Sequence, residues 1–317
     1  MISIKIVLSS QFSAHRLTLI AILLHNTYFY TELLLMTINY QSFFIFLIIF
    51  AAGLDFWLNK RQIDHVLKNR HKVPNDFAKT IKLADHKKAA DYTVAKTQFS
   101  SFGLILSALI TYYLTIGGGI NEINKVMSAF DVSSLLGGSL VVTALAVILS
   151  IVEIPSNLYS TYIIEEKFGF NKTKAKTFAS DVLIDLATTA LVTFAIMYIS
   201  LWIISTLGSS WWVWLWVFLS AVVIIMSALA PALQQLKNKF YPLEDKKLKT
   251  SIEKLLVKCG FESKGLFIMN GSLRSSHGNA FFGGFGKTKR IIFFDTLLEK
   301  LTHKEIEAVI AHELGHF

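Results

Sequence analysis

The sequence has almost no cysteine and little charge for its length. Its single cysteine, Cys259, excludes an internal disulfide bond. No partner near this thiol would make it a nucleophile, so we interpret it as structural. Only 17% of the 317 residues are charged, whereas 53% are hydrophobic. This balance excludes an ordinary soluble protein and indicates a chain that crosses a membrane several times.

Negative charge is the scarcer sign, and the formal net charge is +9. An excess of Lys and Arg would fit nucleic acid or acidic lipid, but its meaning depends on where the basic residues fall. They cluster in alternate loops, at 59–98, at 153–177 and after Ala230, whereas the loop after the second apolar segment carries only Lys125. The positive-inside rule places the three basic regions in the cytoplasm. Topology therefore explains the charge, and we predict no nucleic-acid partner.

Five apolar segments have the length and composition of membrane-spanning helices, so we predict a multi-spanning α-helical membrane protein. They cover residues 42–58, 99–116, 135–151, 183–204 and 211–229. An aromatic belt of the kind found at membrane interfaces opens the fifth segment and consists of Trp211, Trp212, Trp214 and Trp216. The basic stretch 59–98 is expected to be a hydrophilic loop that is helical in parts.

Polar residues at the third and fourth segments suggest where these helices end and what they face. Glu153, Pro155 and Asn157 are expected to end the third helix. Asp181 and Asp185 lie one turn apart near the start of the fourth segment, and carboxylates are costly beside lipid. Either both face a water-filled interior or the span begins after Asp185.

The first 35 residues lack the small-residue cleavage site of a signal peptide. Their apolar part, 17–35, is interrupted by His25, Asn26 and Glu32, and Met36 opens a cleaner segment. Either translation starts at Met36, or the leading residues form a poor additional span or an interfacial helix. We divide the chain into this extension (1–35), a membrane domain (36–236) and the N-terminal part of a zinc peptidase domain (237–317).

From Lys237 onward the composition is that of a soluble α+β domain. An amphipathic helix is expected at 250–259, and short strands at 265–269, 279–282 and 290–294. The glycine-rich turn 283–286 lacks the Lys-Ser/Thr ending of a phosphate loop, so we interpret it as a hairpin turn. Asp295 is expected to cap a helical turn that leads to the last helix.

The last helix carries the pattern with the clearest chemistry. Thr302 and Glu305 form a capping box, after which apolar residues recur at helical spacing at 306, 309, 310 and 314. Within that helix, His312-Glu313-x-x-His316 puts two imidazoles one turn apart on one side, where both can bind a single Zn²⁺. Glu313 would then act as general base on a water bound by the metal. The alternative is a surface helix with two solvated histidines.

Six stretches of the chain form a recognisable set: 154–155 (IP), 164–172 (IEEKFGFNK), 240–245 (FYPLED), 274–282 (RSSHGNAFF), 286–298 (GKTKRIIFFDTLL) and 312–316 (HELGH). By these stretches the chain resembles the CAAX prenyl protease 1 family of membrane-integral zinc metallopeptidases, from about Met36 to Phe317. This resemblance implies a seven-helix membrane barrel around a water-filled chamber, with zinc at the cytoplasmic end. The membrane would be the bacterial inner membrane or that of the endoplasmic reticulum.

The resemblance also implies an activity and roles for particular residues. Family members remove the last three residues of prenylated C-terminal CAAX sequences. By this resemblance His312 and His316 are zinc ligands, Glu313 is the general base, and Asn279 lies on the strand that holds the substrate backbone. The family's third ligand is a glutamate well downstream, so we expect residues 1–317 to lack it and to be an incomplete protease. Within the chain, His277 and Glu299 are the candidates to replace it.

Other functions stay open. An intramembrane-cleaving zinc protease would carry HExxH inside an apolar span, but the helices around it are amphipathic, with charges at 299, 300, 304, 305 and 307. A transporter or a catalytically incomplete membrane scaffold would keep the helices without a zinc site. In an organism without prenylation, quality control of membrane proteins would be the better function. All these alternatives share the lipid bilayer as a partner, and the proteases also share a peptide or lipidated protein substrate.

The charge distribution predicts which loops share a side of the membrane. We expect positions 79 and 172 to face the side of Glu313, and position 125 to face the opposite side. In a Cys259→Ser background, single cysteines at Lys79, Lys125 and Lys172 are labelled with an impermeant maleimide. Labelling of positions 79 and 125 from the same side would contradict the topology.

Overall fold

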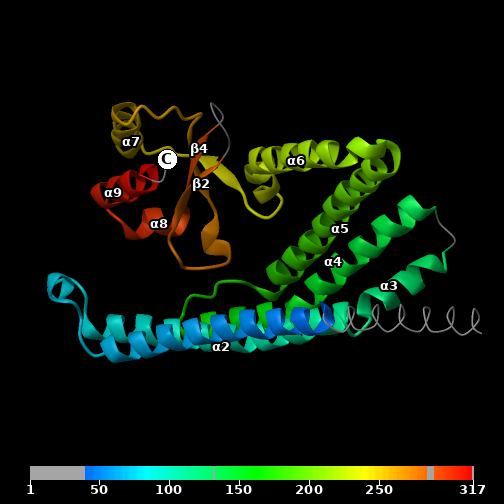
Figure 1. Cartoon of the computed structure of the whole chain (residues 1–317). Helices are drawn as coiled ribbons and strands as arrows, with labels where there is room; N and C mark the ends of the chain where they lie inside the picture. Colours follow the sequence, from blue (N-terminus) through cyan, green and yellow to red (C-terminus); the bar gives the residue numbers. More distant parts are fainter. Residues whose placement is uncertain (1–39, 131–132, 284–288, 316–317) are drawn as a thin grey trace, which may run out of the picture. The chain divides into compact units, whose positions relative to one another are not determined.

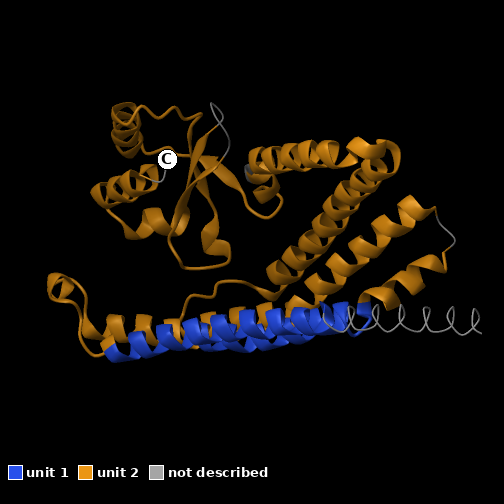
Figure 2. Ribbon diagram, viewed as in Figure 1, with its two compact units in different colours: residues 1–68, 97–119 blue, residues 69–96, 120–317 orange. Residues whose placement is uncertain are grey.

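The structure, a computed structural model, describes residues 40–130, 133–283 and 289–315 (Figure 1). Two compact units divide the chain, one of residues 1–68 and 97–119 and the other of residues 69–96 and 120–317 (Figure 2). The predicted N-terminal extension, 1–35, lies outside the described residues. The division of the chain into membrane and peptidase domains stays a prediction.

Within the described ranges, five helices are long and apolar enough to cross a membrane, and each coincides with one predicted span to within a residue or extends beyond it. They are the helix Tyr40–Asn69, α2 (Leu83–Thr115), α4 (Ser134–Tyr159), α5 (Ala175–Thr206) and α6 (Trp211–Gln234). The tryptophans that open α6 are largely exposed, as residues at a lipid interface should be. The prediction of a multi-spanning α-helical membrane protein is therefore confirmed.

The third helix does not end at Glu153, Pro155 and Asn157, so that prediction is wrong. α4 runs through Pro155 to Tyr159 and continues as a π-helix, Ser160–Glu165. Proline is tolerated within membrane helices because local π adjustments and neighbouring groups satisfy the carbonyls that it frees. The chain therefore stays helical well beyond the apolar segment.

Much of the predicted hydrophilic loop 59–98 is also helical. The first helix continues to Asn69, a 3₁₀ turn covers Asn75–Phe77, and α2 begins at Leu83. Lys and Arg are good helix formers, so a basic composition does not interrupt these helices. Another amphipathic helix, α3 (Gly119–Ser128), follows the second span and contains Lys125.

The soluble region is built on a four-stranded sheet in the order β1-β2-β4-β3. Its strands are β1 (Phe240–Pro242), β2 (Leu266–Met269), β3 (Ala280–Gly283) and β4 (Arg290–Phe294). β2 and β4 are parallel, while β1 and β3 pair antiparallel at the two edges. The three predicted strands are present. β1 was not predicted, because it is three residues long and ends in a proline, which only an edge strand tolerates.

Three helices pack on this sheet and form the core with it. They are α7 (Lys246–Lys258), α8 (Asp295–Lys300) and α9 (His303–Leu314), which lie together on one face of the sheet (Figure 1). Ile252 of α7, Phe293 of β4 and Ile310 of α9 are fully buried in one cluster. Cys259, interpreted as structural, is exposed where α7 ends. Asp295 is the first residue of α8, and its carboxylate accepts the N–H of Ser272 as well as that of Thr296, each at 2.8 Å.

The two aspartates of α5 form ion pairs with cations of the soluble region. Asp181 accepts two hydrogen bonds from the Arg274 guanidinium, at 2.6 and 2.7 Å. Asp185 lies 2.5 Å from the Lys237 ammonium. Both aspartates line a polar cavity of about 440 Å³. The helix α5 begins at Ala175, ten residues before Asp185, which does not test whether the membrane span begins after that residue. Both alternatives for these aspartates stay predictions.

We predict that the Arg274–Asp181 pair holds the soluble region to α5. Their side chains are only 24% and 18% exposed, so Arg274→Gln leaves a carboxylate largely removed from water and should lower the free energy of unfolding by about 2 kcal/mol. Thermal unfolding in detergent measures this as a lower apparent Tm. The double variant Arg274→Gln/Asp181→Asn should lose less free energy of unfolding than the sum of the losses in the two single variants.

The matched control is Lys125→Gln. It breaks an ion pair with Glu122 whose side chains are 62% and 63% exposed, so it should change stability by less than about 0.5 kcal/mol. If Arg274→Gln and Lys125→Gln lower the stability equally, the Arg274–Asp181 pair does not hold the soluble region to α5.

Candidate metal centre

The helix that carries the histidine motif begins as predicted. Thr302 and Glu305 form the capping box, and the Thr302 N–H donates to Glu305 Oε2 at 2.7 Å. Ile306 and Ile310 are buried against the sheet and fix the rotation of α9. The position of every later side chain on this helix follows from that rotation.

His312 and Glu313 take different positions because of this packing. At 100° per residue, His312 lies about 200° around the helix from Ile310. Its side chain is exposed, on the face away from the core. Glu313 flanks the buried face and is half-buried. His316, the second predicted ligand, lies outside the described residues.

The edge of the sheet nearest to this helix is β3, which contacts α9. The Phe294 N–H donates to the Asn279 carbonyl at 2.9 Å, so residues 279 and 281 bond to β4. In an antiparallel ladder the intervening residues point the other way, which leaves the N–H and C=O groups of Ala280 and Phe282 at the outer edge. Those groups could pair with an added strand.

Asn279 was predicted to lie on this strand, and it lies one residue before it. Its exposed side chain turns back along the edge, and Asn279 Oδ1 accepts the Ala280 N–H at 2.9 Å. The first outward-facing amide of β3 therefore already has a partner. An added strand would meet the Ala280 carbonyl and both Phe282 groups first, so Asn279 limits where pairing can begin.

The in-chain candidates for a third ligand have other surroundings. His277 Nε2 lies 3.2 Å from Glu165 Oε2, and its ring packs against Phe170 in a tilted arrangement with a centroid separation of 4.2 Å. Glu299 is exposed on α8. Within residues 40–130, 133–283 and 289–315, no three His, Cys, Asp or Glu side chains lie close enough together to hold a metal ion.

His312, the predicted ligand that the structure describes, is nevertheless compatible with zinc binding. An exposed imidazole on a rigid helix, with a carboxylate next to it in the sequence, is the type of ligand and base that zinc hydrolases use. The buried residues Ile306 and Ile310 hold α9 in one orientation, which a metal ligand requires. We therefore keep His312 as the ligand and Glu313 as the base to be tested.

A polar cluster that the sequence did not reveal anchors the loop before β3. The Tyr92 hydroxyl of α2 donates to Glu165 Oε1 at 2.6 Å, and Glu165 also lies beside His277. The Ser276 N–H donates to the Phe170 carbonyl at 3.0 Å. In the sequence, the stretch 164–172 stands out because it carries part of the family resemblance. It does not indicate which residues Glu165 and Phe170 contact.

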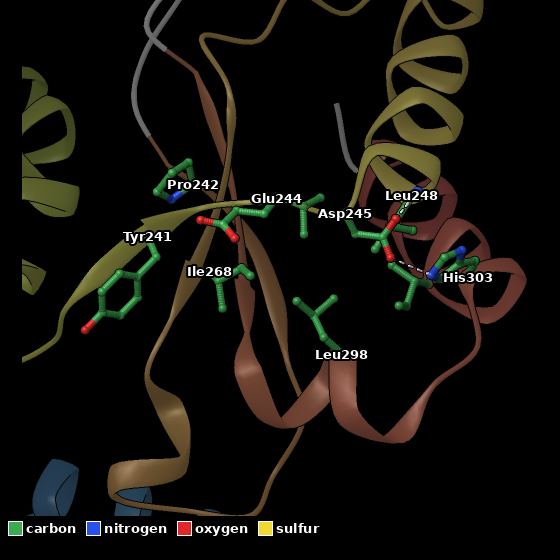
Figure 3. Close-up of a pocket in the computed structure, with 10 residues that line it drawn as sticks. Tyr241, Pro242, Glu244, Asp245, Leu248, Ile268, Leu298 and His303 are labelled. Atoms are coloured by element: carbon green, nitrogen blue, oxygen red, sulfur yellow. Dashed lines mark hydrogen bonds and ion pairs between the residues drawn. The ribbon is translucent and has the colours of Figure 1, made fainter.

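A second cavity of about 440 Å³ lies beside the other edge strand, β1 (Figure 3). It is lined in part by Tyr241, Leu298 and an ion pair between Asp245 and His303 at 3.1 Å. His312, Glu313 and Asn279 do not line it. It lies at the start of α9, whereas His312 and Glu313 are near that helix's end, so we do not regard it as the metal centre.

Two carboxylates at helix starts make the soluble region sensitive to acid. The Leu248 N–H, together with the Lys247 N–H and His303, lowers the pKa of Asp245 at the start of α7. The Thr302 N–H and hydroxyl lower the pKa of Glu305 in α9. Because both pKa values are lower in the folded state, their stabilisation is complete above the unfolded values near 4 and is lost as pH falls through the folded values.

We predict that hydrogen exchange in the first turns of α7 and α9 accelerates below about pH 4, after correction for intrinsic rates. Asn also caps helices but does not titrate there, so Asp245→Asn should keep the protection of α7 and remove its dependence on pH. Glu253→Gln, an exposed change on α7, is the control and should alter neither. Protection that is constant from pH 6 to pH 3 in the unmodified protein would contradict the prediction.

Comparisons with known proteins show which family the chain resembles. Residues 62–235 match a family model described as the CAAX prenyl protease N-terminal region with five membrane helices, and residues 242–317 match peptidase family M48. The chain is 33% identical to the probable CAAX prenyl protease 1 of Schizosaccharomyces pombe, over 83% of this chain and 58% of that protein. It is 36% identical to CAAX prenyl protease 1 of Saccharomyces cerevisiae, over 73% of this chain and 53% of that protein.

A solved structure is also similar. The crystal structure of S. mikatae Ste24p has a TM-score of 0.79 and 32% sequence identity, and the match covers 87% of this chain and 66% of that one. The chain therefore spans between 53% and 66% of the length of these three proteins.

Proposed function

Because this chain belongs to peptidase family M48 and carries the five-helix N-terminal region of the CAAX prenyl proteases, we propose that it is a zinc-dependent membrane metalloendopeptidase. Its proposed substrates are prenylated proteins, from which it removes the C-terminal tripeptide. The observation that carries this proposal is the contact between α9, which bears His312 and Glu313, and the edge strand β3.

The proposed roles follow from the two elements. His312 and His316 would hold the metal, since residues four apart share one side of a helix. Bound zinc would polarise the scissile carbonyl and make water a stronger nucleophile near neutral pH. Glu313 would accept the proton from that water and donate it to the leaving amine. Glu313 is half-buried and follows the exposed His312, so part of its side chain is open to solvent. This supports the role, because a general base must reach the water on which it acts.

Substrate would bind by strand addition to β3. The outward-facing groups of Phe282 and the carbonyl of Ala280 can accept an extended peptide, which gives affinity without regard to side chains. Asn279 would set where this pairing begins, because its side chain holds the Ala280 N–H. A prenyl group would supply the selectivity that backbone pairing lacks.

The metal site is proposed to face the cytoplasm. Contacts among the three basic regions support a common side: Tyr92 bonds Glu165, and the Lys172 N–H donates to the Arg274 carbonyl at 3.0 Å. We also propose the domain division of 36–236 and 237–317, which the matched ranges 62–235 and 242–317 support. Quality control of membrane proteins and a catalytically incomplete scaffold are the alternatives.

The decisive experiment compares zinc content and cleavage in the full-length protein. Glu313→Gln should retain zinc and lose cleavage of a farnesylated CAAX peptide by roughly 100-fold or more, because the general base is gone. His312→Ala should lose both zinc and cleavage. His303→Gln, a histidine change on the same helix outside the motif, should keep both. Zinc retained in His312→Ala would contradict the ligand assignment, and an unmodified protein that binds no zinc and cleaves no peptide would favour the scaffold.

A second test addresses Asn279. Asn279→Ala should raise KM for the peptide severalfold while zinc content stays unchanged, because the variant frees the Ala280 N–H and shifts where the substrate strand pairs. Asn279→Asp, which keeps the acceptor oxygen, should behave nearly as the unmodified protein. If zinc or folding is lost in Asn279→Ala, the residue is structural.

A further inference from the structure

A groove between the first helix and α2 is not used by the proposed peptidase site. It has a volume of about 370 Å³ and is lined by Phe56, Lys60 and Ile63 of the first helix and by Gln98, Ser101, Phe102 and Ile105 of α2. All these residues belong to one compact unit, drawn in blue in Figure 2. Asn59 Nδ2 donates to Ser101 Oγ at 3.1 Å, which holds the two helices together at the groove.

The groove changes character along its length. Phe56 and Ile105 lie at the end next to the apolar segments, and Phe102 and Ile105 are 61% and 54% exposed. Lys60, Ile63 and Gln98 lie farther along the groove, where the basic stretch begins. Seven residues of helix separate Phe56 from Ile63, a length of about 10 Å. The groove is therefore apolar along most of its length, and Lys60 is its cationic lining residue.

The neighbouring side chains indicate the depth of this transition. The Arg61 guanidinium lies over the Trp57 ring, 4.7 Å from its centroid. Tryptophan and basic residues gather at the boundary between hydrocarbon and headgroups. Lys60 is thus at the level of lipid phosphates, and Phe56 and Ile105 are at the level of acyl chains.

The charge of the groove indicates which lipid it prefers. Lys60 forms no ion pair with any residue that the structure describes. An ammonium in this position attracts an anionic headgroup, while the exposed aromatic and aliphatic side chains contact the chain below it. An isoprenoid on a peptide thioether has no anion at the corresponding position and would leave Lys60 without a partner.

We propose that this groove is a binding site for an anionic phospholipid, whose phosphate is held by Lys60 and whose acyl chain lies against Phe56, Phe102 and Ile105. The site is independent of the peptidase function and would serve the protein whichever substrate it cleaves. It differs from ordinary lipid contact around a membrane protein because it pairs a shaped apolar groove with a cation that can hold a headgroup.

The experiment measures lipid retention by native mass spectrometry. The purified protein is mixed with phosphatidylglycerol and phosphatidylcholine of the same acyl chains, and the ratio of bound lipids is compared between variants. Phosphatidylglycerol should be retained preferentially, and Lys60→Gln should lower that preference about fivefold. Lys60→Arg should preserve it. The control is Lys68→Gln, which removes the same charge from the same helix outside the groove and should have little effect.

A second variant tests the contribution of the apolar lining without changing the charge of Lys60. Ile105→Trp fills the apolar end and should weaken retention of phosphatidylglycerol while Lys60 is intact. Equal effects of Lys60→Gln and Lys68→Gln would overturn the proposal in favour of diffuse surface charge. Equal retention of both lipids would mean unselective lipid contact only. Displacement of phosphatidylglycerol by millimolar inorganic phosphate would overturn the proposal by assigning the groove to a free anion. Displacement of phosphatidylglycerol by a farnesyl thioether would overturn it by assigning the groove to an isoprenoid.

Discussion

A soluble sheet that works beside membrane helices must be held to them by polar contacts, because apolar side chains have no reason to leave lipid for one another. Arg274 supplies the strongest of these contacts. Its guanidinium bonds twice to Asp181 of α5 and also to Asn238 Oδ1 and the Lys237 carbonyl. Its own carbonyl accepts the Lys172 N–H from the segment before α5. The edge strand β3 begins six residues later, so Arg274 helps to position it.

The features that could be predicted from the sequence are those that a local pattern of residues determines. The five membrane helices follow from apolar length, and the start of α9 follows from the capping box of Thr302 and Glu305. The rotation of α9 follows from its apolar residues, so the helical pattern alone implies the exposed position of His312. Three strands were visible because β-branched and aromatic residues cluster between turn residues.

The rest depended on contacts between distant residues. Nothing near Asp181 in the sequence indicates Arg274, 93 residues away, so the aspartates could be assigned only to water or to the end of a span. The continuation of α4 through Pro155 depends on neighbours that satisfy its carbonyls, and β1 is a strand only because β2 pairs with it. The bond from the Ala280 N–H to Asn279 has meaning only because β3 is an edge.

The adjacent carboxylates Glu165 and Glu166 show how the end of α4 reaches the site. Neighbouring side chains on a helix point about 100° apart, so only one of them can face the soluble region. Glu165 faces it and contacts Tyr92 and His277. Glu166 instead accepts the Asn171 Nδ2–H at 2.9 Å. That bond closes the turn between the π-helix and α5 and helps to place Phe170 against the His277 ring. One carboxylate therefore contacts the loop before β3 directly, and the other fixes the aromatic surface on which that loop rests.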